Sequence, residues 1–341
     1  MIRRQKQIKN ILITGGAGFI GINASEYFIR KGYQVIIFDD FSRAGASVNL
    51  KWLGKKYPKK FNVVRASTVN DFPKLVHEVG KNDVVLHLAA QVAVTTSVTN
   101  PRDDFERNAL GTFNVLEAVR LSKRKPLLIY SSTNKVYGGL ENLGVAEKKI
   151  RYTFKNLPLG VSESQPLDFH SPYGCSKGSA DQYVRDYSRI YNLDTAVFRQ
   201  SCIYGPHQFG IEDQGWVAWF IIATNLGKQI TIYGNGKQVR DVLFVDDLCR
   251  AYELVILKRK KVSGQIFNIG GGPSNTLSLL EFMPMLGPVK YKFSKTRPGD
   301  QPIFISDISK ARKMLGWQPK VGVREGIKRI TEWVKANKKE F

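Results

Sequence analysis

The chain is 341 residues long, with 43% hydrophobic and 24% charged residues, so it can bury a large core in one or two domains and is not a disordered protein. No apolar run approaches the roughly 18 residues that a membrane helix needs, so we expect no membrane partner. The formal net charge is +23, which would attract polyanions and nucleotide sugars alike.

Short apolar runs alternate with helical patterns in the first part of the chain. Strands are expected at 8–13, 34–38, 61–65, 84–88, 127–131 and 195–199, and helices at 19–31, 104–122 and 171–190. This alternation predicts an α/β fold, a Rossmann-type doubly wound parallel sheet. Because right-handed crossovers bring the carboxyl ends of the strands to one edge, the polar residues that follow the strands should meet there.

The pattern loosens after about residue 200, where Trp, Gly and Pro interrupt shorter elements. We therefore divide the chain into a sheet domain at 1–200 and a smaller C-terminal α/β cap at 201–341 that binds substrate. Segment 240–270 is expected to return to the sheet domain, since 242–245 and 267–269 are apolar enough to rejoin the sheet.

The N-terminal segment is basic and then apolar, which mimics a secretory signal. Its apolar part is the expected strand 8–13, so we expect no cleavage. Three cysteines without metal-binding spacing indicate reduced thiols of a cytosolic protein: Cys175, Cys202 and Cys249.

The run TGGAGFIG ends the first expected strand and opens a helix. Its glycines, Gly15, Gly18 and Gly21, let the backbone approach a pyrophosphate, which then lies at the helix N-terminus. Asp39 ends the second expected strand, where a carboxylate binds the adenosine ribose hydroxyls and would repel a ribose phosphate. The sequence therefore predicts a dinucleotide site in the sheet domain that takes NAD rather than NADP, a preference that Arg43 weakens slightly.

Residues 168–178 read DFHSPYGCSKG and place Tyr173 and Lys177 four residues apart, on one face of the expected helix. A tyrosinate base must lower its pKa from about 10 to about 7, which needs roughly 4 kcal/mol of anion stabilisation. One ammonium at about 4 Å supplies roughly that at an effective dielectric near 20, so Lys177 could nearly suffice, with a nicotinamide cation adding more. Such a base indicates an oxidoreductase-type enzyme whose substrate carries a hydroxyl.

A hydroxyl at the end of the expected strand 127–131 can hold the substrate hydroxyl in line with Tyr173. Ser131, Ser132 and Thr133 all compete for this role, and each could instead serve in a cap or a turn.

Nearly from end to end, the chain resembles the extended short-chain dehydrogenase/reductase family of nucleotide-sugar epimerases and dehydratases. The resemblance is carried by GGAGFIG, DVVLHLAAQ, SSTNKVYGG, SPYGCSKG, CIYGPHQ, GNGKQVRDVLFVDDL and RPGDQ. The strings SSTNKVYG, LDFHSPYGCSKG, ADQY, DQGWV and GNGKQVRDVL are more similar to the branch that inverts carbon 2 of a CDP-activated dideoxyhexose. They are also far more specific than the widely shared GGxGxxG.

The resemblance implies NAD as cofactor, no metal, and a homodimer or higher homo-oligomer, with helices 104–122 and 171–190 as candidates for the interface. It also implies a triad of Thr133, Tyr173 as base and Lys177 as its partner. It implies NAD contacts from Gly15, Gly18, Phe19, Ile20, Gly21, Asp39, Asp40, Ser42, Arg43, Ser67, Leu88, Ala89, Ala90, Gln91, Asn108, Ser131, Tyr173 and Lys177. It implies substrate contacts from Thr133, Asn134, Ser201, Gln208, Gln214, Val217, Arg240, Arg297 and Asp300. The two arginines suit a pyrophosphate or ribose, although each could form a surface ion pair instead.

The chain departs from the family at Ser67, which stands where an acidic residue usually bonds the adenine. Asn108 is expected to support the active site rather than react. After Thr133, Asn134 and Lys135 replace the Asp-Glu pair with which the family's 4,6-dehydratases eliminate water, and this disfavours a dehydratase.

Two other functions stay open. One is a different NAD-dependent nucleotide-sugar epimerase, such as a UDP-sugar 4-epimerase. The other, from a different class, is a polyanion- or RNA-binding protein on a dehydrogenase fold. It rests on the charge of +23 and on five lysines within 51–60, for which a solvated helix face is the plainer interpretation.

Overall fold

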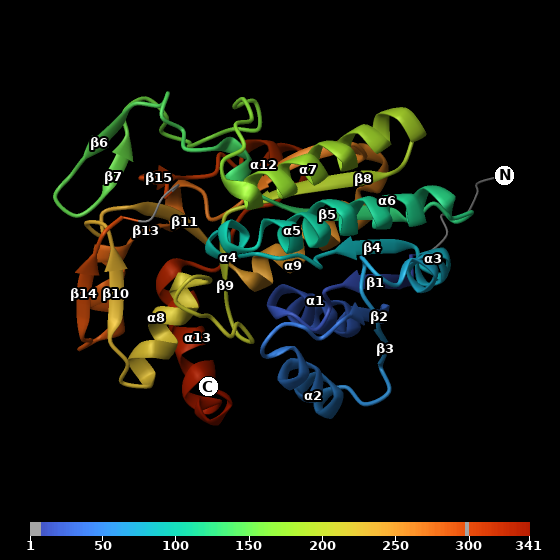
Figure 1. The fold of residues 1–341 in the computed structure, drawn as a ribbon, viewed down its shortest axis with the longest axis horizontal. Coiled ribbons are helices and arrows are strands. Elements are labelled where there is room, and N and C mark those ends of the chain that lie inside the picture. Colours follow the sequence, from blue (N-terminus) through green and yellow to red (C-terminus); the bar gives the residue numbers. More distant parts are fainter. Residues whose placement is uncertain (1–7, 297–299) are drawn as a thin grey trace.

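A computed structural model describes residues 8–296 and 300–341. Its centre is a seven-stranded parallel sheet in the order β12-β8-β5-β4-β1-β2-β3 (Figure 1). The strands are β1 (Asn10–Thr14), β2 (Gln34–Asp39), β3 (Phe61–Arg65), β4 (Val84–His87), β5 (Leu127–Thr133), β8 (Thr195–Gln200) and β12 (Gln265–Ile269). The predicted α/β fold with a doubly wound sheet is confirmed.

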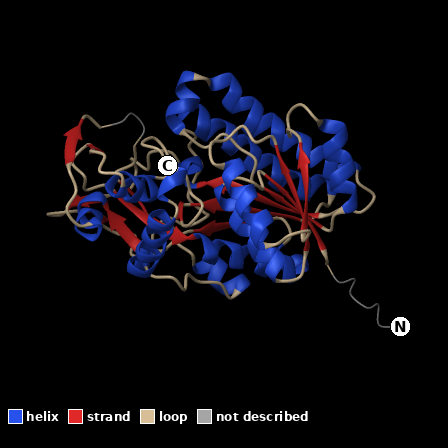
Figure 2. Ribbon diagram, turned by 90° about the horizontal axis from the view of Figure 1, so that it is seen from below, coloured by secondary structure: helices blue, strands red, loops and turns tan. Residues whose placement is uncertain are grey.

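Helices cover both faces of this sheet (Figure 2). One layer contains α1 (Phe19–Arg30), α2 (Ala46–Lys56) and α9 (Val245–Leu257), and the other contains α3 (Phe72–Lys81), α6 (Gly111–Leu121) and α7 (Ser171–Tyr191). Successive side chains of a strand point to opposite faces, so Ile11 and Ile13 pack into one core and Leu12 into the other. Burial on both faces explains why these strands read as continuous apolar runs.

The strand order reverses beside β1, because β2 and β3 lie on one side of it and β4 on the other. In such sheets the ligand crevice lies beyond the carboxyl ends of the strands at this reversal. The turn after β1 and the segment after β4 approach closely there, since a Cβ added to Gly15 would lie 2.7 Å from the Ala89 nitrogen.

The cap is built from short strands and helices of the second half of the chain. Its elements are β9 (Cys202–Tyr204), α8 (Trp216–Asn225), β10 (Ile230–Tyr233), β11 (Val239–Phe244), β13 (Thr276–Ser278), α11 (Leu279–Phe282), β14 (Tyr291–Ser294), β15 (Ile303–Phe304) and α13 (Val323–Ala336). The remaining α-helices and strands are α4 (Val94–Thr99), α5 (Pro101–Phe105), the hairpin β6 (Val145–Glu147) and β7 (Tyr152–Phe154), α10 (Arg259–Val262) and α12 (Ser309–Leu315). In the part of the chain that the structure describes, no helix combines the length and apolarity needed to cross a membrane.

One predicted strand joins a different sheet. Residues 242–244 belong to β11, which pairs with β9, β13 and β15 in the cap rather than with the central sheet. Residue 245 already begins α9, which packs on α1. An apolar run predicts burial, but it does not say in which sheet the strand is buried. By contrast, 267–269 do lie in β12 at the edge of the central sheet.

The predicted helix 104–122 is interrupted. It consists of the end of α5, a π-helical turn η1 (Glu106–Leu110) and then α6. The turn aims the buried Asn108 side chain inward, where Nδ2 donates to Asp104 (3.0 Å) and to the Ser176 hydroxyl (3.1 Å) and Oδ1 accepts from the Gln91 amide (2.9 Å). Single π-helical turns of this kind are frequent at functional sites.

Candidate active site

A cavity of about 360 Å³ lies at the carboxyl edge of the sheet, between the β1–α1 turn and residues 200–217. It is lined by the following predicted residues: Gly15, Gly18, Phe19, Ile20, Gly21, Asp39, Asp40, Ser42, Arg43, Ser67, Leu88, Ala89, Ala90, Ser131, Thr133, Tyr173, Lys177, Ser201, Gln208, Gln214 and Val217. The predicted residues that do not line it are Gln91, Asn108, Asn134, Arg240 and Asp300. Arg297 lies outside the described residues.

The glycine turn fits a dinucleotide pyrophosphate. Gly18 is the N-cap of α1, and no side chain caps this helix, so its first N–H groups are left for an anion. A Cβ on Gly18 would meet only the Gly15 carbonyl oxygen, at 3.3 Å. The backbone of Phe19, Ile20 and Gly21 also lines the cavity.

Asp39 joins the glycine turn to the end of β2. Its Oδ2 accepts from the Ala17 amide (2.9 Å) and its Oδ1 from the Phe41 amide (2.8 Å). Burial raises the pKa of Asp39, and the two backbone N–H groups oppose that rise. Asp39 therefore has a structural role in addition to the ribose contact expected of it.

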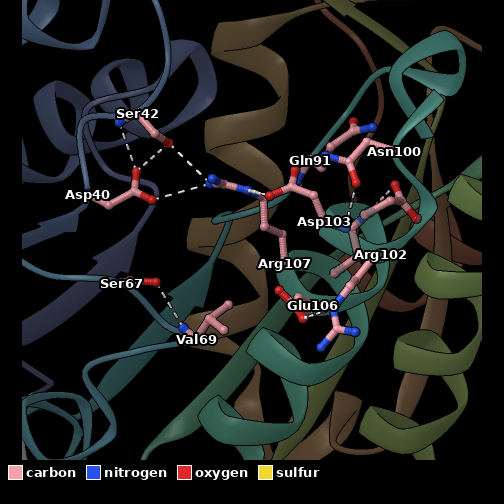
Figure 3. Close-up of polar contacts among 12 residues, drawn as sticks. Asp40, Ser42, Ser67, Val69, Gln91, Asn100, Arg102, Asp103, Glu106 and Arg107 are labelled. Atoms are coloured by element: carbon pink, nitrogen blue, oxygen red, sulfur yellow. Dashed lines mark hydrogen bonds and ion pairs between the residues drawn. The ribbon is translucent and has the colours of Figure 1, made fainter.

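The loop after β3 holds Ser67 in a local turn. Its hydroxyl accepts from the amide of Val69 at 3.1 Å (Figure 3) and from that of Asn70 at 3.4 Å. Ser67 lines the cavity, but its side-chain oxygen is an acceptor within its own loop.

The three competing hydroxyls at the end of β5 have different partners. Ser131 lies 3.3 Å from the Tyr252 hydroxyl and accepts from Gln200 (2.6 Å), while Ser132 donates to Asp181 (2.7 Å). Among the three, only the Thr133 hydroxyl acts on the phenol of Tyr173, whose pKa it lowers. Its own hydrogen bonds run to Asn134 (3.4 Å) and from the Lys135 amide (3.2 Å).

Burial raises the pKa of Tyr173 to about 12. The Thr133 hydroxyl and the positive charge of Arg43 oppose this rise, and the Asp104 carboxylate adds to it. The structure differs here from the expectation that Lys177 nearly suffices to ionise the phenol. The Lys177 ammonium donates instead to the Ser131 carbonyl (2.6 Å) and lies 4.3 Å from the centre of the Tyr130 ring.

Lys177 is buried beside two carboxylates. Burial lowers the pKa of Lys177 to about 7, and the charges of Asp181 and Asp104 oppose that fall. Asp181 also forms a fully buried ion pair with Arg199 (2.9 Å). Asp104 accepts from Ser176 (2.5 Å) and from Asn108. These bonds connect the π-helical turn to α7, the helix that carries Tyr173 and Lys177.

Three of the residues predicted to bind substrate, Asn134, Arg240 and Asp300, do not line the cavity. Arg240 forms an ion pair with Asp300 (2.6 Å) that is largely buried, so it is not a surface pair. Asn134 accepts from Thr133 at 3.4 Å. Burial, and then the charge of Arg240, lower the pKa of Lys135 to about 8, while the charge of Asp300 opposes this fall. Lys135 and Arg240 are therefore two cations beside one carboxylate. Within residues 8–296 and 300–341, no cluster of three or more His, Cys, Asp and Glu suits a metal ion.

Some residues of the cavity were not predicted. They are Phe38, Ala66, Thr68, Val69, Val92, Arg107, Gln200, Cys202, Ile203, Gly215 and Trp216. Most of these residues lie next to predicted residues at the ends of strands. This position in the sequence is the signal that could have identified them. Arg107 has no such signal, because the π-helical turn determines where its side chain points.

Comparison with known proteins places the chain in a family. Residues 12–330 match the family model described as GDP-mannose 4,6 dehydratase. The CDP-paratose 2-epimerase of Salmonella typhi is 45% identical over 333 residues, which cover 95% of this chain and 98% of that protein.

Two solved structures extend the likeness. The UDP-glucose 4-epimerase of Thermotoga maritima, solved with UDP-glucose, is 31% identical, with a TM-score of 0.80 over 96% of this chain and 99% of that one. The UDP-glucuronic acid 4-epimerase of Bacillus cereus, in complex with UDP-glucuronic acid and NAD, is 28% identical, with a TM-score of 0.80 and the same coverage. The chain therefore belongs to the GDP-mannose 4,6-dehydratase family, within the extended short-chain dehydrogenases/reductases.

Proposed function

We propose that this protein is an NAD-dependent epimerase that inverts carbon 2 of a CDP-activated dideoxyhexose, interconverting CDP-paratose and CDP-tyvelose. The observation that carries the proposal is that Thr133, Tyr173 and Lys177 line the same cavity as the glycine turn. The 45% identical relative, named for this reaction, supports the sugar and the nucleotide. The relative solved with NAD supports the cofactor.

The carbon to be inverted carries a hydroxyl without a neighbouring carbonyl, so its C–H is not acidic. NAD, when bound, would supply the hydride acceptor for this carbon and the hydride donor for its opposite face. Tyr173 accepts the hydroxyl proton while the ketone forms and gives it back when the hydroxyl is restored. Thr133 lines the same cavity as Tyr173 and would hold the reacting oxygen in line with it, and Lys177 is anchored to the end of β5 through the Ser131 carbonyl.

The side chains around the triad favour epimerisation over loss of water. Elimination needs an acid and a base in addition to Tyr173. The two residues after Thr133 are Asn134 and Lys135. Among the described residues, the carboxylates that line the cavity are Asp39 and Asp40, which follow β2 near the glycine turn.

The test is to incubate the NAD-loaded enzyme with CDP-paratose and to follow the anomeric and ring protons by NMR. We expect CDP-tyvelose to appear until the two epimers reach equilibrium, with no net change in NAD. A sample that binds NAD but leaves CDP-paratose unchanged would reject the proposed substrate.

A UDP-sugar 4-epimerase is the second candidate, favoured by the 31% identity to the Thermotoga maritima enzyme. The same assay with UDP-glucose and UDP-galactose separates the two candidates, because the two reactions invert different carbons. A gel-shift assay with RNA at low salt tests the remaining alternative, which rests on the net charge of +23.

We further propose that the protein is a cytoplasmic homodimer. An aromatic cluster covers the outer faces of α6 and α7, where Phe113 contacts Tyr183 (5.9 Å between ring centres) and Tyr187 contacts Tyr191 (4.8 Å). Tyr183 and Ile190 are 52% and 66% exposed in the single chain, which is unusual for such side chains unless a partner covers them. Light scattering should give twice the chain mass, and a monomeric mass at micromolar concentration would refute this.

A further inference from the structure

The end of the cavity near β2 has two walls that approach each other. One wall is the loop after β2, with Asp40 and Ser42, and the other is the π-helical turn, with Arg107 (Figure 3). All three residues line the cavity. Figure 3 shows the Arg107 side chain extending from its helix across to Asp40 and Ser42.

Arg107 joins these walls through two groups of its guanidinium. Nη1 lies 3.3 Å from Asp40 Oδ2 and donates to the Ser42 hydroxyl at 3.2 Å. Nε donates to Asp103 at 2.8 Å, on the helix side of the cavity. Within the described residues Nη2 has no hydrogen bond or ion pair, so its N–H groups are left for a ligand.

The loop that receives Arg107 is itself held in shape. Asp40 Oδ1 accepts from the amide (2.9 Å) and the hydroxyl (2.6 Å) of Ser42. Burial favours the neutral form, but these bonds and the Arg107 charge hold the pKa of Asp40 below its usual value. The carboxylate that faces Arg107 is therefore ionised at neutral pH.

We propose that Arg107 is a clasp that closes the cavity over the adenosine half of the bound dinucleotide and slows its release. The inference rests on the proposed function, because it takes NAD as the ligand. An epimerase of this kind ends each turnover with the cofactor in its starting state, so release is not needed. If the reduced cofactor were released in mid-reaction, the oxidised sugar could not be converted to either epimer. A clasp that holds the cofactor prevents this loss of substrate.

The direct test replaces Arg107 with Met, which keeps the apolar stem and removes the charge and every donor. The rate of NADH release from the loaded enzyme is measured by stopped-flow fluorescence after mixing with excess NAD. Partly exposed ion pairs contribute little, so we expect release to accelerate about threefold to tenfold. The Arg107 and Asp40 side chains are 38% and 35% exposed, which also makes the wild-type release rate rise with salt.

Arg102→Met is the matched control. Arg102 lies on the same side of the cavity and pairs with Glu106 at 2.9 Å, but it is 89% exposed and does not line the cavity. We expect its release rate and salt dependence to match those of the wild type. If both variants accelerate release equally, the effect is one of general surface charge and the clasp is refuted.

Asp40→Asn distinguishes a clasp from a direct contact of Arg107 with the cofactor. If the two walls are held together through this pair, the single variants accelerate release and the double variant is no faster than either. Additive effects would overturn the clasp. Failure of the wild type to bind NADH would instead reject the proposed function, while binding with an unchanged release rate in Arg107→Met would reject the clasp alone.

Discussion

Replacing Tyr173 with Phe removes one oxygen from the cavity and changes little else. The side chain is 9% exposed, and it lines the cavity together with Thr133. Phe fills the same volume, and Thr133 keeps its bonds to Asn134 and to the Lys135 amide. Even the loss of one hydrogen bond would correspond to only about 1 kcal/mol, so the variant should fold and bind NAD.

The expected loss of activity is much larger than the loss of stability. With a pKa of about 12, ionising Tyr173 at pH 7 costs about 7 kcal/mol. A phenolate that forms before the reaction therefore does not explain how Tyr173 acts as a base. A positioned base that acts in the transition state contributes typically 10²- to 10⁴-fold. We therefore expect the turnover rate of Tyr173→Phe to fall by about that factor, with bound NAD unchanged.

The assay is NMR of the sugar at matched enzyme concentration, with NAD measured after denaturation and the melting temperature measured alongside. Tyr183→Phe is the control, because it removes a phenol from the exposed face of the same helix, where Tyr183 is 52% exposed. Turnover of Tyr173→Phe within tenfold of the wild type, at full NAD content, would show that this phenol is not the base.

Three further predictions concern the charges around the base and the substrate. Asp104→Asn removes a carboxylate that favours the charged form of Lys177, so the alkaline limb of the pH–rate profile should move to lower pH; an unmoved limb would contradict this. Asp181→Asn leaves Arg199 buried without its ion pair, and the free energy of unfolding measured in urea should fall by about 3–5 kcal/mol. The pKa of Lys135 is about 8, so calorimetric binding of CDP should weaken as pH rises through 8 and Lys135→Gln should abolish that dependence.

Much of the fold was predictable because local and global requirements agree. The central strands are buried on both faces, so each one reads as an apolar run, and the glycine turn after β1 is required by the close approach of Gly15 to Ala89. The helical spacing of Tyr173 and Lys177 placed both side chains at the same cavity wall. The apolar runs, the glycine turn and the spacing of Tyr173 and Lys177 each lie within a short segment of the chain. A single sequence is therefore sufficient to detect them.

The choice among the three hydroxyls needed long-range contacts. Strand alternation turns Ser132 away from Ser131 and Thr133, and it meets Asp181 from α7. Ser131 and Thr133 share a face, and only the tertiary structure places Tyr252 and Gln200 against Ser131. Likewise, no sequence spacing predicts the π-helical turn, which depends on Asn108 finding its partners in other segments.

The difference between the expected and the observed role of Lys177 bears on how the base is controlled. The protein's own groups keep Tyr173 neutral, with a pKa of about 12, and direct the Lys177 ammonium to the Ser131 carbonyl. Arg43 is the cation that bears on the phenol, and it lines the cavity near the glycine turn. We infer that the remaining stabilisation of the phenolate comes with the positively charged nicotinamide. Proton abstraction by Tyr173 is then linked to the presence of a hydride acceptor, so the hydroxyl loses its proton only where the carbon can lose its hydride.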